Sequence, residues 1–157
     1  MTRREEESSS QESGASSEEF PVSVSVSLPV PVPNFDNAGF WEACRRHELR
    51  VQRCHGCGAL RHPPRPMCPH CNSVAHEWAR LSGQGKVHTF TIVHGPTLPV
   101  FQARAPYNVA VIELAEGPFM VSNVVACGLD QICIGMAVEI VFEDASDEIR
   151  LPKFRPA

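Results

Sequence analysis

The chain has 157 residues, of which 43% are hydrophobic, enough for one domain or for two small modules that share a core. No apolar run approaches the roughly 20 residues that cross a bilayer, and the polar N-terminus does not resemble a secretory signal, so we expect a cytoplasmic protein without a membrane partner. The formal net charge of −4 comes from residues 1–19, which hold two arginines and six glutamates, whereas residues 20–157 are neutral. This neutrality argues against a protein that mainly holds nucleic acid.

Residues 1–33 differ in composition from the rest of the chain. Residues 1–19 are rich in Ser and Glu and contain no aromatic side chain, so we expect a disordered acidic tail. From residue 21 to residue 28 apolar residues alternate with serine, which is typical of a strand, and prolines then occupy every second position. We therefore expect residues 20–33 to form a Pro-rich extended arm, either an edge strand or a peptide that binds a partner.

A helical segment is predicted over residues 34–48, because Asp36 or Asn37 suits the position that caps a helix N-terminus. Its apolar side chains form one stripe, namely Phe40, Trp41 and Cys44.

The rest of the chain divides into a metal ribbon and a barrel. The two cysteine pairs of residues 49–80 predict a metal ribbon. Over residues 81–157 the expected strands are Val87–Val93, Tyr107–Leu114, Phe119–Val125, Ala137–Phe142 and Ile149–Phe154, with Glu116-Gly117 as a hairpin turn. This pattern predicts a mainly β chain that ends in a small barrel.

Four of the seven cysteines form two Cys-x-x-Cys pairs separated by ten residues: Cys54, Cys57, Cys68 and Cys71. Two residues between the sulfurs let one tight turn aim both thiolates at a single metal, and Gly56, Gly58 and Pro69 suit such turns. The pattern predicts Zn²⁺, and the site is structural because four thiolates leave no open coordination position. Two disulfides or a redox pair are weaker alternatives in a reducing cytosol, and His55 or His70 in place of a cysteine is another.

Two groups of residues are candidates for docking. Residues 41–80 hold seven arginines against three acids, and Arg53, Arg61 and Arg65 are either a solvated basic face or a site for anionic groups such as the phosphates of coenzyme A or of nucleic acid. Leu98, Phe101 and Tyr107 lie on or beside a Pro-rich loop, where they either contact a partner or pack over the barrel mouth.

The sequence contains no nucleophile elbow, no Gly-rich phosphate loop and no paired histidine and carboxylate at a known catalytic spacing. The isolated polar residues of the strands are more typical of satisfied structural positions than of a catalytic site. We therefore expect no catalytic residue in this chain and no enzymatic activity of the chain alone.

From about Phe40 to Pro156 the sequence resembles a family of zinc-ribbon/OB-fold proteins that accompany acyl-CoA enzymes. The matching segments include Phe40-Trp41-Glu42, the two cysteine pairs with the intervening His62-Pro63-Pro64-Arg65-Pro66, Ser82-Gly83-Gln84-Gly85, Gly135-Met136-Ala137-Val138 and Pro152-Lys153-Phe154-Arg155-Pro156. A bare pair of Cys-x-x-Cys motifs is generic, whereas these segments in this order are far more specific.

The resemblance implies an N-terminal helical segment, a rubredoxin-like zinc ribbon and a C-terminal OB-fold barrel. It also implies a non-catalytic accessory or scaffold subunit that binds and stabilises a thiolase-like acyl-CoA enzyme, an aldolase or an acyltransferase. The implied partners are a thiolase-like or lipid-transfer-protein-like subunit or a MaoC-like hydratase, with acyl-CoA near the interface, in steroid side-chain or other lipid acyl-CoA metabolism.

The alternative function is binding of single-stranded nucleic acid, since zinc ribbons and OB-folds do this in other proteins. Only 7% of the residues are aromatic, and residues 81–157 hold eight acids against five basic side chains. Both features disfavour a groove that follows phosphates and stacks bases.

Overall fold

The computed structural model describes residues 29–157 of the chain. The acidic tail expected at residues 1–19 and most of the arm expected at residues 20–33 lie outside these described residues. The described end of the arm, Pro29 to Pro33, contains no helix or strand. No helix in the described part of the chain is long and apolar enough to cross a membrane.

The first helix, α1, spans Ala38–Arg45 and is therefore shorter than the helical segment expected from the sequence. Asn37 occupies the N-cap position, but its side chain accepts a hydrogen bond from the Asn34 N–H at 2.7 Å instead of capping the helix. The helix ends because His47 adopts a left-handed conformation, with φ of 59°, and the N–H of Glu48 reaches back to the Ala43 carbonyl at 3.0 Å.

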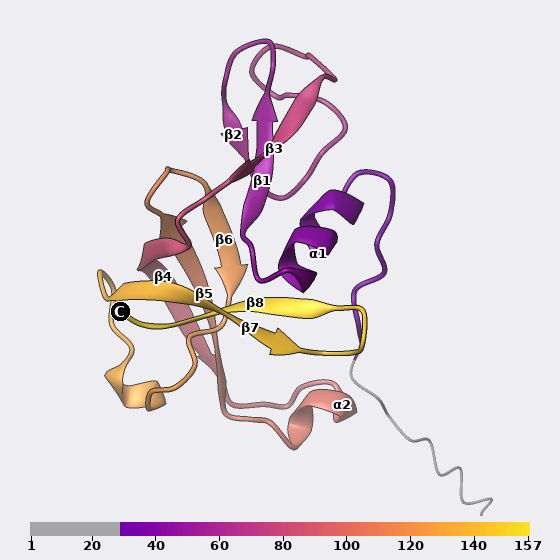
Figure 1. Ribbon diagram of the computed structural model, residues 1–157. Coiled ribbons are helices and arrows are strands. Elements are labelled where there is room, and N and C mark those ends of the chain that lie inside the picture. Colours follow the sequence, from indigo (N-terminus) through magenta and orange to yellow (C-terminus); the bar gives the residue numbers. More distant parts are fainter. Residues whose placement is uncertain (1–28) are drawn as a thin grey trace, which may run out of the picture.

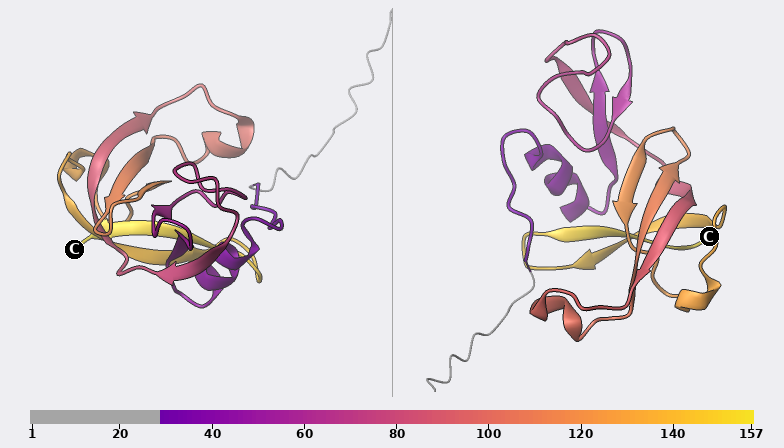
Figure 2. Two further views of the ribbon diagram at one scale, coloured as in Figure 1. Left: turned by 90° about the horizontal axis from the view of Figure 1, so that it is seen from above. Right: turned by 180° about the vertical axis from the view of Figure 1, so that it is seen from behind.

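The ribbon is a three-stranded antiparallel sheet in the order β2-β1-β3. Its strands are β1 (Arg50–Cys54), β2 (Leu60–Arg61) and β3 (His76–Arg80). It stands above the barrel with α1 beside it, and the view from behind places α1 between the ribbon and the hairpin of β7 (Ala137–Asp144) and β8 (Arg150–Pro156) (Figures 1 and 2).

The rest of the described chain forms a curled five-stranded antiparallel sheet in the order β6-β5-β4-β7-β8, a half-barrel of the kind expected from the sequence. The strands are β4 (Gln84–Val93), β5 (Tyr107–Leu114), β6 (Phe119–Ser122), β7 (Ala137–Asp144) and β8 (Arg150–Pro156). Two short helices lie in the connections, α2 (Pro99–Gln102) and the 3₁₀ turn η1 (Leu129–Gln131). The mainly β architecture expected from the sequence is confirmed, and β5 has the bounds that the sequence predicts.

The edge strands β6 and β8 meet at one end, so the sheet nearly closes. A parallel bridge joins Val124 to Phe154, and the N–H of Phe154 donates to the Asn123 carbonyl at 3.0 Å. The buried Asn108 side chain ties β5 to the same place, because its amide donates to the Val124 carbonyl and accepts from the Val124 N–H, both at 2.7 Å. The expected strand Phe119–Val125 therefore stops at Ser122, where the chain turns to make this closure.

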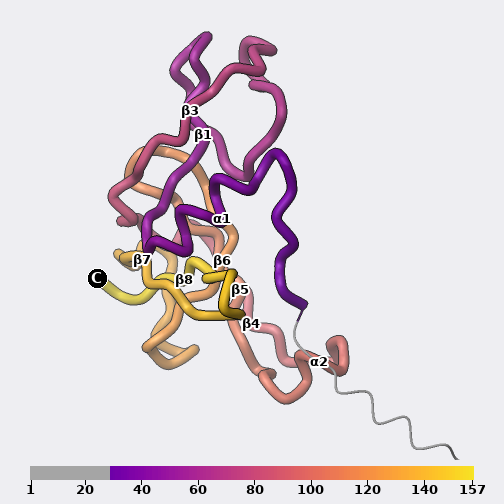
Figure 3. Tube along the Cα trace, turned by 45° about the vertical axis from the view of Figure 1, so that its right-hand side comes forward, coloured from indigo at the N-terminus to yellow at the C-terminus, as the bar shows by residue number. Residues whose placement is uncertain are grey.

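One hydrophobic core serves both modules. Phe40, Cys44, Leu49 and Val51 from the helix and ribbon belong to the same buried cluster as the barrel side chains, which include the fully buried Phe154. The tube view follows the chain from the ribbon at the top into the barrel below (Figure 3). The domain boundaries expected from the sequence, near residues 34, 49 and 81, stay predictions.

Candidate metal centre and docking surfaces

The two cysteine pairs sit on two turns built in the same way. In the first, Cys54 N–H donates to the Ala59 carbonyl at 3.0 Å and Gly58 N–H donates to the Cys54 carbonyl at 2.9 Å. In the second, Cys68 N–H donates to Ser73 and Asn72 N–H donates to Cys68, both at 2.9 Å. The repeated pattern aims four sulfurs at one point from two segments of the chain.

The residue after each pair adopts a left-handed conformation, with φ of 73° at Gly58 and 60° at Asn72. The sequence predicted this role for Gly58 but missed Asn72, although its place after Cys71 matches that of Gly58 after Cys57. At Gly56 the lack of a side chain matters, because a Cβ there would lie 3.1 Å from the Cys71 Sγ.

The four sulfur atoms lie within 4.8 Å of one another. The Cys54 and Cys71 sulfurs are 3.5 Å apart, and the Cys57 and Cys68 sulfurs are 3.7 Å apart. A tetrahedron of Zn–S bonds of about 2.3 Å has edges of about 3.8 Å, so these two spacings match a tetrahedral Zn²⁺ site. A full set of four sulfurs defines a structural zinc site.

Hydrogen bonds already favour the thiolate form at part of this cluster. The backbone N–H groups of His70 and Cys71 lower the pKa of the Cys68 thiol, to about 6. At Cys71 the N–H of Ser73 acts in the same direction, but the neighbouring Cys54 and Cys57 thiols outweigh it and raise the pKa of Cys71 to about 12. A divalent cation supplies the charge that allows all four sulfurs to ionise together.

Beneath the metal cluster lies a buried polar network that the sequence did not reveal. Gln52 is fully buried, and its carbonyl oxygen accepts from the Arg61 Nε at 2.6 Å and from the Arg65 N–H at 3.0 Å. The Gln52 amide nitrogen lies 3.2 Å from the His76 Nε2. This network fixes the link between the two cysteine turns. A lone glutamine in a short strand gives no signal for such a role.

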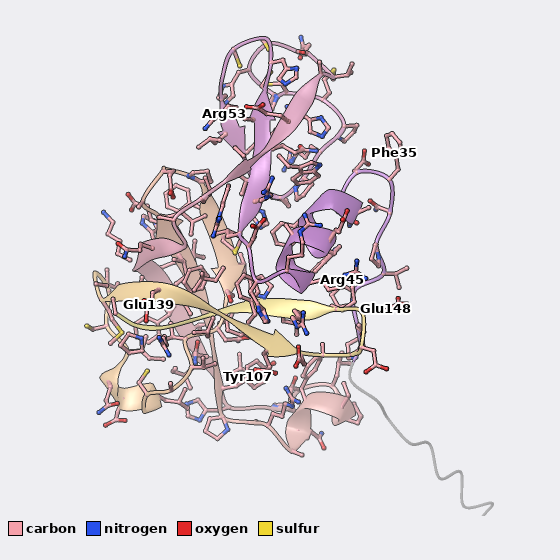
Figure 4. The ribbon with its side chains drawn as sticks, in the orientation of Figure 1. Phe35, Arg45, Arg53, Tyr107, Glu139 and Glu148 are labelled. Atoms are coloured by element: carbon pink, nitrogen blue, oxygen red, sulfur yellow. The ribbon has the colours of Figure 1, made fainter. Side chains whose placement is uncertain are left out.

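The three candidate arginines of the ribbon have different surroundings. Arg61 is only 6% exposed and donates to Gln52 and to the Arg65 carbonyl, so it presents almost no surface to a partner. Arg53 is exposed on the outer side of the ribbon and pairs with Glu77 at 3.5 Å (Figure 4). The Arg65 side chain is exposed and forms no salt bridge among the described residues.

The candidate docking loop joins β4 to β5 at the end of the barrel remote from the ribbon (Figure 1). Leu98 is 66% exposed at its tip. Phe101 and Tyr107 are half-buried, with ring centroids 6.1 Å apart, so they form the apolar base of the loop. The structure therefore brings the three loop residues together but leaves them far along the molecule from the arginines of the ribbon (Figure 4).

An apolar groove of about 450 Å³ separates the helix and ribbon from the barrel edge. Trp41, His62 and Pro63 form one wall, and side chains of β6 and β8 form the other. The His62 ring lies 5.2 Å from that of Phe40, and burial lowers the pKa of His62 to about 4. Lys153 supplies the groove with a cationic side chain, and no carboxylate lines it.

A four-sulfur ribbon sharing one core with an OB-fold barrel defines a class of two-module zinc-ribbon/OB-fold proteins. The chain matches the family model for the ChsH2 rubredoxin-like zinc ribbon domain over residues 41–77, and that for the ChsH2 C-terminal OB-fold domain over residues 78–143. The chain belongs to this ChsH2 family of zinc-ribbon/OB-fold proteins, as the resemblance in its sequence indicated, and its zinc is structural.

Relatives and solved structures agree with this assignment. The chain is 43% identical over 129 residues to a probable enoyl-CoA hydratase alpha subunit of Thermomonospora curvata, covering 82% of this chain and 40% of the relative. It is 40% identical to a DUF35 domain-containing scaffold protein of Methanocaldococcus jannaschii, covering 66% and 77% of the two chains. A chain of the solved Ltp2-ChsH2(DUF35) aldolase is 42% identical, with a TM-score of 0.73 and coverage of 81% and 98%.

The chain spans 40% of the length of the Thermomonospora relative. A DUF35-family structure from Sulfolobus solfataricus, 15% identical with a TM-score of 0.57, shares the fold.

Proposed function

We propose that this chain is a non-catalytic accessory subunit that binds and stabilises a thiolase-like acyl-CoA enzyme, an aldolase or an acyltransferase. The observation that carries the proposal is the match to the Ltp2-ChsH2(DUF35) aldolase, in which the chain covers 98% of the ChsH2-type partner at 42% identity. A scaffold protein of the same family, matched over 77% of its length, also supports an accessory role.

The enzyme binds at the β4–β5 loop in this proposal. Leu98 exposes 66% of its surface, and the half-buried pair Phe101 and Tyr107 holds the loop in place beneath it. An exposed apolar side chain on a supported loop is a typical anchor of a protein interface.

The ribbon faces the acyl-CoA in the same proposal. Arg53 and Arg65 are exposed, and guanidinium groups are well suited to the phosphates of coenzyme A. Arg61 is left out of this surface because its guanidinium is buried against Gln52.

The substrate belongs to steroid side-chain or other lipid acyl-CoA metabolism. A 35% identical relative from Mycobacterium tuberculosis is named 3-oxo-4,17-pregnadiene-20-carboxyl-CoA hydratase alpha subunit, which supports this class and a MaoC-like hydratase as a second partner.

Co-expression with an Ltp2-type aldolase subunit from the same source tests the proposal. We expect the two chains to co-elute and the aldolase to lose solubility or activity when this chain is absent. Leu98→Asp should weaken the complex at least about tenfold, as expected for loss of an interface anchor. Ile134→Asp is the matched control, because Ile134 is 70% exposed but lies on the η1–β7 connection, away from the loop (Figure 1).

Separate elution, with an aldolase subunit that is fully soluble and active alone, would overturn the accessory role. Equal weakening by both substitutions would leave the complex standing but remove the loop as its anchor.

A further inference from the structure

Arg61 carries a buried positive charge that no carboxylate balances in the described part of the chain. The residue lies on β2 and is only 6% exposed. Every other arginine of the ribbon strands forms a salt bridge with a glutamate, namely Arg50, Arg53 and Arg80. Arg61 forms none with the described acidic side chains. Charged side chains are almost never buried without an opposite charge, so a different kind of group is needed to balance Arg61.

The Arg61 guanidinium joins the two segments that lead to the cysteine turns. Its Nε donates to the Gln52 side-chain oxygen at 2.6 Å, and its Nη2 donates to the Arg65 carbonyl at 3.3 Å. Gln52 stands two residues before Cys54. Arg65 stands three residues before Cys68. The remaining nitrogen, Nη1, is buried and has no hydrogen-bond partner among the described residues. Arg61 therefore fixes both cysteine-bearing segments and still has an unbalanced charge.

Arg61 faces the same side of the ribbon as the metal cluster. In the register of the sheet it lies directly opposite Gln52, so the two side chains share one face. Residues two apart in a strand also share a face and are about 7 Å apart, so Cys54 lies on that face next to Gln52. Arg53 lies on the other face, opposite its partner Glu77. A buried cation therefore lies one residue pair below a cysteine ligand, on the face that carries the metal.

The metal centre has the opposite charge. Four thiolates around one divalent cation leave two net negative charges, and the ligands Cys54 and Cys68 are buried. We propose that the Arg61 guanidinium is the counter-charge of this centre and raises its affinity for the metal. Arg61 is the only buried charged side chain among residues 29–157. The basic side chains next to the cysteine pairs are exposed, and solvent screens their charges: Arg53, His55, Arg65 and His70.

Three variants of the full chain separate the charge of Arg61 from its hydrogen bonds. Arg61→Gln keeps a side-chain donor but removes the charge, and Arg61→Lys keeps the charge. Arg53→Gln is the matched control, because it removes an exposed charge from the same sheet. Competition with a chelator of known affinity measures the zinc dissociation constant of each chain. We expect Arg61→Gln to weaken zinc binding at least about tenfold and the other two variants to weaken it less than about threefold.

Iron in place of zinc reports the charge of Arg61 without depending on folding energy. With four thiolates, the ferrous centre carries one more negative charge than the ferric centre, so a nearby cation favours the ferrous form. Arg61 donates no hydrogen bond to a sulfur of the cluster, so a shift of the potential reports its charge. In chains loaded with Fe²⁺, Arg61→Gln should lower the midpoint potential by the equivalent of about tenfold, which is about 59 mV for one electron. Arg61→Lys and Arg53→Gln should each change it by the equivalent of less than about threefold.

The potential decides between a charge role and a packing role. An unchanged potential in Arg61→Gln would overturn the proposal even if zinc binding is weaker, because only packing would then have been lost. An equal fall of the potential in Arg61→Lys or in Arg53→Gln would overturn it as well, and so would unchanged zinc binding in Arg61→Gln. All measurements use the chain alone, so their outcome is independent of whether an enzyme partner binds.

Discussion

Asn108 closes the barrel, and its replacement gives a sharp test of the fold. The side chain is 5% exposed, and its amide bonds both the N–H and the carbonyl of Val124 at 2.7 Å. The Asn108 side chain thus makes the two hydrogen bonds that a neighbouring strand backbone would otherwise make to Val124. These bonds join β5 to the segment after β6 that contacts β8.

Asn108→Leu keeps a similar volume but leaves two buried backbone groups of Val124 without partners. Each unsatisfied buried group costs about 1–3 kcal/mol, so we expect the free energy of unfolding to fall by about 3–4 kcal/mol. Urea unfolding with saturating zinc measures this loss. A decrease below about 1 kcal/mol would show that Asn108 does not hold the closure.

Asn108→Asp separates the donor from the acceptor. The new carboxylate still accepts from the Val124 N–H, but its other oxygen faces the Val124 carbonyl, and this contact together with burial raises the pKa of the folded state above the unfolded value of about 3.9. The protonated acid donates to that carbonyl, so the variant is closest to the natural chain at low pH. It loses stability as pH rises through the folded pKa. A difference from the natural chain that stays constant from about pH 3 to pH 8 would refute this.

Three other predictions concern the helix, the groove and the metal. Gly39→Ala should lower the free energy of unfolding by about 1–3 kcal/mol, because the new Cβ would lie 2.3 Å from the Trp78 Nε1. This loss is expected although alanine favours the helix more than glycine does. An unchanged urea midpoint would contradict the packing of Gly39 against Trp78. Burial lowers the pKa of His62 to about 4 in the folded chain, whereas the unfolded chain takes up this proton near pH 6.5. The free energy of unfolding should therefore fall as pH drops from about 6.5 to 4. His62→Gln should flatten that slope. Elemental analysis should find one zinc per natural chain, and Cys71→Ser should abolish this zinc and unfold the ribbon. Full zinc retention in the variant would remove Cys71 from the metal site.

The sequence predicts the elements of this fold better than their ends. Alternation and β-branched residues define β5 to the residue, because its alternate side chains are buried in strict order. The helix α1 ends at Arg45, before the end of the helical segment expected over residues 34–48, because its end depends on the left-handed His47, and no glycine signals that turn. The expected strand Phe119–Val125 is too long because the closure with β8 redirects the chain after Ser122, a contact between residues distant in sequence.

The metal cluster could be predicted because its information is local. Each Cys-x-x-Cys pair, with the left-handed residue that follows it, lies within one short segment of the chain. The buried network around Gln52 and the closure by Asn108 could not, since a polar side chain in a strand has the same local pattern whether it faces solvent or a partner on another strand. The burial of Arg61 has the same origin, because its guanidinium meets Gln52 from a neighbouring strand.

The shared core has a consequence for how the protein responds to its metal. Phe40, Leu49 and Val51 belong to one buried cluster with the barrel, so we expect the ribbon and the barrel to unfold as a single cooperative unit. Any ligand that binds only the folded state stabilises the whole unit by mass action. Zinc bound at the ribbon is therefore expected to stabilise the barrel as well, so removal of the metal should destabilise the β4–β5 loop at the far end of the molecule together with the ribbon.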